Sequence, residues 1–93
     1  MGTQIAEETF TLEEILASVK ESNRLILWND DTNTFDHVIH CMMHYLDYSE
    51  EEAEKIAWHV HTKGKCVILE GSHTEMEVYR KILKAEGLSV SVE

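Results

Sequence analysis

The sequence predicts a small α+β domain, an α/β sandwich in which a three-stranded antiparallel sheet carries three helices packed on one face. Three observations lead to this prediction. The chain has 93 residues, enough for one modest core. Short apolar runs typical of strands alternate with longer segments of helical periodicity, in the order β-α-α-β-α-β. Capping boxes, in which a Ser or Thr precedes a Glu by three residues, mark several helix starts.

The N-terminal part of the chain is predicted to be separate from this domain. Residues 1–23 are polar at first and are expected to form a partly flexible extension. Thr11 and Glu14 form a capping box that favours a short amphipathic helix over 12–20, too short to be stable without tertiary support. The folded domain is expected to span 24–93.

The first strand is predicted over 24–28, where four apolar residues form a run of strand length. Thr34 is a good N-cap for a helix over 35–46, whose apolar residues share one arc. A second helix begins after Ser49 in a capping box and ends at Gly64, a residue type that commonly terminates helices.

The second half of the domain adds two strands and a helix. The apolar run 66–69 is predicted to be a strand buried on both faces, ended by Gly71. Ser72 opens the third helix of the domain, which Gly87 ends. The strict apolar-polar alternation of 88–92 predicts a half-buried outer strand.

The composition narrows the classes of partner. Eighteen acidic residues against eight Lys and Arg give a net charge of −10, which repels phosphate backbones and anionic lipid, so neither nucleic acid nor membrane is expected. No apolar stretch approaches membrane-spanning length, and no signal peptide is expected to carry Cys41 and Cys66 to an oxidising compartment. Both thiols are therefore expected to be reduced. No cofactor is predicted.

An acidic turn follows the first predicted strand. It reads Asn29-Asp30-Asp31, and Asn33 extends its polar character. Asn and Asp favour turns because their side chains hydrogen-bond the local backbone. Adjacent carboxylates attract cations or amines, although a merely solvated turn would have the same composition.

A second motif, Val60-His61-x-x-Gly64-Lys65, changes the interpretation. With the Asn-Asp-Asp turn it resembles the ClpS family of proteolytic adaptors over about residues 24–93. The resemblance implies a cytoplasmic bacterial protein that is monomeric and catalyses no reaction. It also implies a role in the N-degron, or N-end rule, pathway: recognition of bulky hydrophobic N-terminal residues and delivery to the N-terminal domain of a Clp AAA+ unfoldase.

The same resemblance implies a receptor for the substrate α-amino group. It is formed by Asn29, Asp30 and His61, with Asp31 and Asn33 supporting the turn. An amide oxygen, a carboxylate and a neutral imidazole nitrogen offer three acceptors for the three N–H donors of an ammonium group. Because the turn is expected to be exposed, we expect replacement of Asp30 to weaken binding and to leave stability almost unchanged.

An apolar pocket beside the receptor would select the N-terminal side chain. The resemblance implies the lining Phe35, Val38, Cys41, Ala57, Val60 and Leu88. The chain departs from the family at two positions. Thr34 stands where a proline is usual. Phe35 stands where a methionine is usual, at a position that resembles a lid over the pocket. Ala57 replaces a bulkier apolar residue.

Two other functions are compatible with the residue types. His37, His40 and His44 share one face of the helix over 35–46 and could bind a metal in a sensor domain, or could simply be a solvated face. Cys66, His61 and Asn29 supply the residue types of a cysteine hydrolase. A thiol inside an apolar strand is, however, usually a small core residue.

Overall fold

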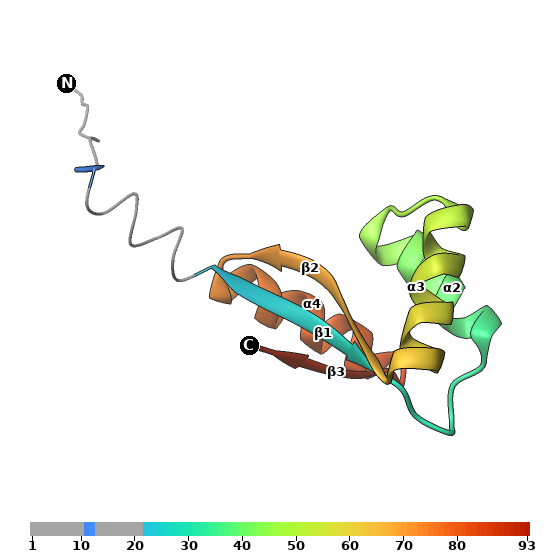
Figure 1. Cartoon of the computed structure of the whole chain (residues 1–93). Coiled ribbons are helices and arrows are strands. Elements are labelled where there is room, and N and C mark those ends of the chain that lie inside the picture. Colours follow the sequence, from blue (N-terminus) through green and yellow to red (C-terminus); the bar gives the residue numbers. More distant parts are fainter. Residues whose placement is uncertain (1–10, 13–21) are drawn as a thin grey trace.

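The computed structural model of the chain describes residues 11, 12 and 22–93. The predicted α+β class and the order of elements are confirmed. The six elements, shown in Figure 1, are β1 (Asn23–Trp28), α2 (Phe35–Leu46), α3 (Glu50–Lys63), β2 (Lys65–Gly71), α4 (His73–Ala85) and β3 (Ser89–Val92). Among the described helices, none is long and apolar enough to cross a membrane.

The sheet has the strand order β2-β1-β3, and both pairings are antiparallel. The central strand β1 places Leu25 and Leu27, which are almost wholly buried, in the main core. Helix α4 lies along the sheet and contributes Met76 and Leu83 to this core (Figure 1). Alternate side chains of a strand point to opposite faces, so Leu25 and Leu27 point to the same face of the sheet, the one that α4 covers.

The helix starts follow the predicted capping chemistry. The hydroxyls of Thr34, Ser49 and Ser72 each accept a hydrogen bond from the backbone N–H three residues later. Gly64, with φ 92°, caps α3, and Gly87, with φ 91°, follows α4; both take the left-handed conformation that glycine adopts without strain.

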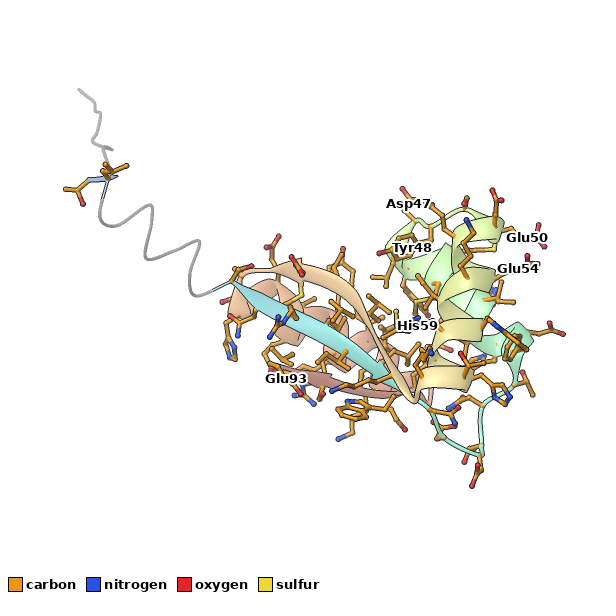
Figure 2. The ribbon with its side chains drawn as sticks, in the orientation of Figure 1. Asp47, Tyr48, Glu50, Glu54, His59 and Glu93 are labelled. Carbon is orange, nitrogen blue, oxygen red and sulfur yellow. The ribbon has the colours of Figure 1, made fainter. Side chains whose placement is uncertain are left out.

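Helices α2 and α3 pack against each other beyond the end of β1, and α2 also contacts Glu86 at the end of α4 (Figure 1). At the far end of this pair Asp47, Glu50 and Glu54 are exposed to solvent (Figure 2). The acidic turn crosses from the sheet to this helical pair. A site at the crossing can therefore draw residues from both parts of the fold.

Several details differ from the predictions. Strand β2 continues through Gly71, which pairs with Asn23, so β1 also begins one residue early. β2 is not buried on both faces: it is an edge strand, and Val67 is 45% exposed because no helix of the described chain covers that face. The expected helix over 12–20 lies, apart from Leu12, outside the described residues.

Candidate functional site

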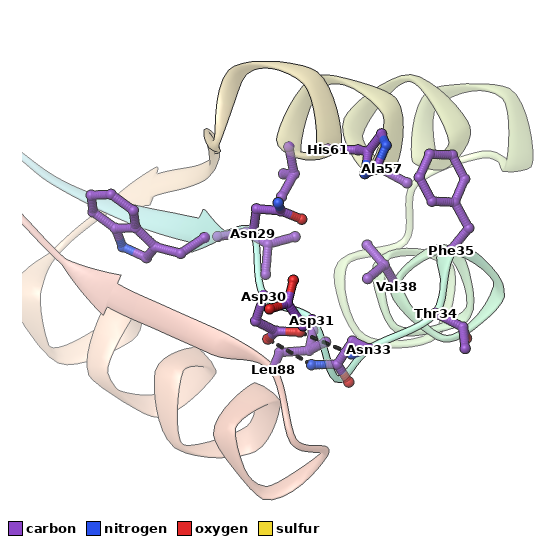
Figure 3. A pocket seen from close by; sticks show the side chains of 13 residues that line it. Asn29, Asp30, Asp31, Asn33, Thr34, Phe35, Val38, Ala57, His61 and Leu88 are labelled. Atoms are coloured by element: carbon purple, nitrogen blue, oxygen red, sulfur yellow. Dashed lines mark hydrogen bonds between the residues drawn. The ribbon is translucent and has the colours of Figure 1, made fainter.

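A cavity of about 300 Å³ lies where β1 ends, α2 begins and α3 makes its last turns (Figure 3). Ten of the eleven residues predicted for the site line it. The complete lining is Leu27, Trp28, Asn29, Asp30, Asp31, Asn33, Thr34, Phe35, Val38, Ala57, Val60, His61 and Leu88. Sequence reasoning missed Leu27, Trp28 and Thr34, which flank the acidic turn.

The Asp30 carboxylate organises the turn from within. Its Oδ1 accepts hydrogen bonds from the backbone N–H groups of Thr32 at 3.0 Å and Asn33 at 2.9 Å. Its Oδ2 accepts from the Asn33 side-chain amide and the Ser89 hydroxyl, both at 2.8 Å. Asn33 also donates to the Gly87 carbonyl at 2.8 Å, so the turn is attached to the segment between α4 and β3.

These contacts change the expected role of Asp30. Burial alone would raise the pKa of Asp30, but the hydrogen bonds from Asn33, Ser89 and Thr32 outweigh it and lower that pKa below its ordinary value of 3.8. The group is therefore ionised at neutral pH and already has four donors. Because the turn is attached to the fold through this carboxylate, we now expect its replacement to lower stability, in contrast to the expectation from the sequence.

Three other polar side chains in the cavity are available to a ligand. Within the described part of the chain, the side chains of Asn29, Asp31 and His61 make no hydrogen bond. The Asn29 backbone N–H donates to the Gly64 carbonyl at 2.9 Å, which brings the end of β1 beside the last turn of α3, where His61 lies. The three side chains therefore line one cavity and present an amide, a carboxylate and an imidazole (Figure 3).

Three rings meet at the edge of the cavity. Phe35 packs edge-on against His61, with ring centroids 5.7 Å apart, and against Trp58 at 5.9 Å. Phe35 is 39% exposed and Trp58 is 60% exposed, so this cluster is at the surface and not in the core. Edge-to-face packing is a preferred arrangement of aromatic pairs and holds Phe35 near the imidazole.

The deeper walls are apolar. Ala57, Val60 and Leu88 are buried and line the cavity together with the partly buried Val38. Cys41 was predicted to join them but does not line the cavity. It lies one turn further along α2 than His37, is completely buried, and has its thiol 3.7 Å from the His37 ring. The small Ala57 leaves room where a larger side chain would fill the cavity.

The structure does not assemble the predicted histidine metal face. His40 and His44 stack with ring centroids 5.4 Å apart. His37 instead donates through Nε2–H to the Glu86 carbonyl at 2.7 Å. Among residues 11, 12 and 22–93, the three imidazoles do not form a metal-ligating group.

The residues of the suggested cysteine hydrolase are also apart. Cys66 lies on β2 and lines a separate cavity with Arg24 and Val67, whereas Asn29 and His61 line the cavity at the turn. Burial raises the pKa of the Cys66 thiol, which disfavours the nucleophilic thiolate. This arrangement supplies no activated nucleophile.

Comparison with known families decides among the interpretations. Residues 19–91 match the family described as "ATP-dependent Clp protease adaptor protein ClpS". The chain belongs to the ClpS family. This is a family of non-catalytic adaptors, so the chain is not expected to be an enzyme.

Individual ClpS proteins show the same relationship. The chain is 32% identical over 69 residues to the Clp protease adapter ClpS of Thermosynechococcus vestitus, covering 73% of each protein. It is 38% identical over 63 residues to the Mycobacterium tuberculosis ClpS, covering 68% of this chain and 62% of that protein.

A solved ClpS structure shares the fold. The structure of Agrobacterium tumefaciens ClpS2 bound to L-phenylalaninamide superposes with a TM-score of 0.72 at 20% sequence identity. The match covers 78% of this chain and 95% of the ClpS2 chain.

Proposed function

We propose that this ClpS-family chain binds the free α-amino group and the bulky hydrophobic first side chain of other proteins, and delivers those proteins to a Clp AAA+ unfoldase. One observation carries the proposal. A single cavity joins three polar side chains that lack hydrogen-bond partners within the described chain, Asn29, Asp31 and His61, to an apolar lining of suitable size.

The polar side of the cavity suits an ammonium group. The Asn29 amide oxygen, an Asp31 carboxylate oxygen and a neutral His61 nitrogen are acceptors for its three N–H donors. Charge-assisted hydrogen bonds of this kind contribute about 1.5–3 kcal/mol each. Asp30 adds negative charge nearby, but its oxygens are already hydrogen-bonded. We therefore assign direct contact with the amine to Asp31 and the support of the turn to Asp30, the reverse of the roles expected from the sequence.

The apolar side would select the first side chain. Val38, Ala57, Val60 and Leu88 surround a space large enough for a Leu or aromatic side chain, and burying such a side chain contributes about 1.5–3 kcal/mol. Phe35 lies at the edge, where its ring can meet an aromatic guest. The relative with the same fold, A. tumefaciens ClpS2, was solved with L-phenylalaninamide, which combines an α-amino group with an aromatic side chain.

Delivery is tested with a folded reporter protein that begins with Phe and carries a flexible N-terminal segment. We expect this chain to accelerate ATP-dependent degradation of the reporter by the Clp protease of its own organism. The same reporter with an acetylated N-terminus serves as the control and should not respond. Equal acceleration of both reporters would contradict amine recognition, whereas tight reporter binding without acceleration would contradict the delivery step alone.

A further inference from the structure

A group of three metal-ligating side chains lies beside the cavity but does not line it. His37 and Cys41 are four residues apart on α2, and Glu86 is the residue that caps α4. Their ligand atoms all lie within 4.8 Å of one another. Residues four apart on a helix lie on one face, so α2 presents an imidazole and a thiol together to the end of α4.

The spacing within this group suits a tetrahedral metal ion. The Cys41 sulfur is 3.7 Å from Nε2 of His37. In a zinc site with Zn–S bonds of about 2.3 Å and Zn–N bonds of about 2.0–2.1 Å, tetrahedral angles place sulfur and nitrogen about 3.6 Å apart. The observed separation therefore needs almost no adjustment of the two side chains.

The third ligand is oriented by its neighbour. The Tyr45 hydroxyl donates a hydrogen bond to one carboxylate oxygen of Glu86, Oε2, and leaves the other oxygen for an ion. Partners of this kind hold ligating carboxylates in place in metal sites. Cys41 is completely buried, and within the described chain its thiol has only the His37 ring as a partner. As part of the core, Cys41 has a fixed position, which holds its thiol beside the imidazole.

From this geometry we propose that His37, Cys41 and Glu86 form a zinc site that ties α2 to the end of α4. Thiolate, imidazole and carboxylate are all zinc ligands, and their two negative charges neutralise the ion. A water molecule or the Glu86 carbonyl oxygen takes the fourth position.

Binding requires two proton movements. Without metal, His37 carries its proton on Nε2 and donates it to the Glu86 carbonyl. Zinc binding at Nε2 moves that proton to Nδ1, with no net loss from the ring. The Cys41 thiol gives its proton to solvent, so each zinc ion releases one proton.

The site would stabilise the wall of the neighbouring cavity. Val38 follows His37 directly, and Leu88 lies two residues beyond Glu86; both line the cavity. A zinc ion would hold these two wall residues at a fixed separation. This inference does not depend on the proposed function, because none of the three ligands contacts the space assigned to the peptide.

The test uses the full chain without an affinity tag, freed of metal by a chelator. Zinc is titrated by calorimetry in buffers of different ionisation enthalpy, and cobalt(II) serves as a spectroscopic probe. We expect one zinc ion per chain, about one proton released per ion, a higher melting temperature, and a sulfur-to-cobalt charge-transfer band.

Variants separate this site from other ligands in the chain. His37→Ala and Glu86→Gln should each weaken zinc binding by about 10–100-fold. The Gln side chain at position 86 still offers an oxygen to accept the hydrogen bond from Tyr45. The matched controls His40→Ala and Cys66→Ala should bind as the wild type does. Absence of zinc binding by the wild type, equal binding by the wild type and a folded Glu86→Gln variant, or loss of binding in His40→Ala would each overturn the site.

Discussion

The Ser89 hydroxyl donates a 2.8 Å hydrogen bond to Oδ2 of Asp30, joining residues that are 59 positions apart in the sequence. This contact attaches the acidic turn to the first residue of β3. With the bond from Asn33 to Gly87, it fixes the turn between the sheet and the helical pair. The neighbouring Asp31 is thereby held at the cavity with its carboxylate free of hydrogen bonds within the described chain.

Replacing Asp30 should therefore destabilise the fold. Asp30→Ala removes an acceptor from four donors, and we expect the free energy of unfolding to fall by about 1–2 kcal/mol. Asp31→Ala is the matched control, because it removes the same group one residue away and should change stability by less than about 0.5 kcal/mol. Chemical denaturation of the two variants measures the difference; equal stabilities would refute the bracing role of Asp30.

The stabilising effect of Asp30 should also depend on pH. Its pKa is lower in the folded chain than in the unfolded one, so its contribution is complete above the unfolded value near 3.8 and is lost as pH falls through the folded value. The stability difference between wild type and Asp30→Ala should thus be largest near neutrality and shrink below pH of about 4. A difference that stays constant from pH 7 to pH 2.5 would show that the charge of Asp30 contributes nothing.

Asp31 should matter for binding. We expect Asp31→Ala to weaken binding of a Phe-initiated peptide at least tenfold, equivalent to about 1.4 kcal/mol, without unfolding the chain. Asp31→Asn keeps an acceptor oxygen but removes the charge, so its affinity for the peptide should lie between those of the wild type and Asp31→Ala. Fluorescence anisotropy with a labelled peptide measures these affinities. If Asp31→Ala binds as tightly as the wild type, the free carboxylate is not part of the receptor.

The fold was predictable because its signals are local. Helix α2 has the predicted bounds, since its N-cap Thr34 and its apolar arc both lie within the segment itself. The exposure of Val67 was not predictable, because an apolar run of strand length looks the same at an edge and at the centre of a sheet. Its exposure depends on the place of β2 at the edge of the sheet and on where the helices pack, neither of which is encoded in the run itself.

Most members of the candidate site were predictable from the sequence, but the hydrogen bonding of its two acids was not. The two motifs indicated Asn29, His61 and the two acids, and all four line the cavity. Adjacent identical residues do not tell which carboxylate is hydrogen-bonded to the rest of the fold, because one of the donors to Asp30, Ser89, lies 59 positions away in the sequence. The prediction for Cys41 failed because helical periodicity does not show which neighbours a buried side chain contacts. The Cys41 thiol lies beside the His37 ring, which hydrogen-bonds to the end of α4.

Phe35 should limit which first residues enter the cavity. A branch at Cβ would meet the Phe35 ring beside the amine receptor, so Ile- and Val-initiated peptides should bind poorly. Phe35→Ala should bind an Ile-initiated peptide more tightly than the wild type does, and binding should still require the free amine. Met43→Ala is a suitable control, because Met43 is also 39% exposed on α2 but does not line the cavity. If Phe35→Ala binds the Ile-initiated peptide no more tightly than the wild type, Phe35 does not control which first residues enter the cavity.

The central claim is that the cavity recognises a protonated N-terminal amine together with an apolar first side chain. Calorimetric titration of the wild type with one peptide in three forms tests it directly: Phe at the first position with a free amine, the same peptide acetylated, and the free peptide with Ser in place of Phe. We predict saturable one-to-one binding of the first form, and affinities at least about 100-fold lower, a loss of about 2.7 kcal/mol, for the other two. Equal binding of the acetylated and free Phe peptides would contradict the account.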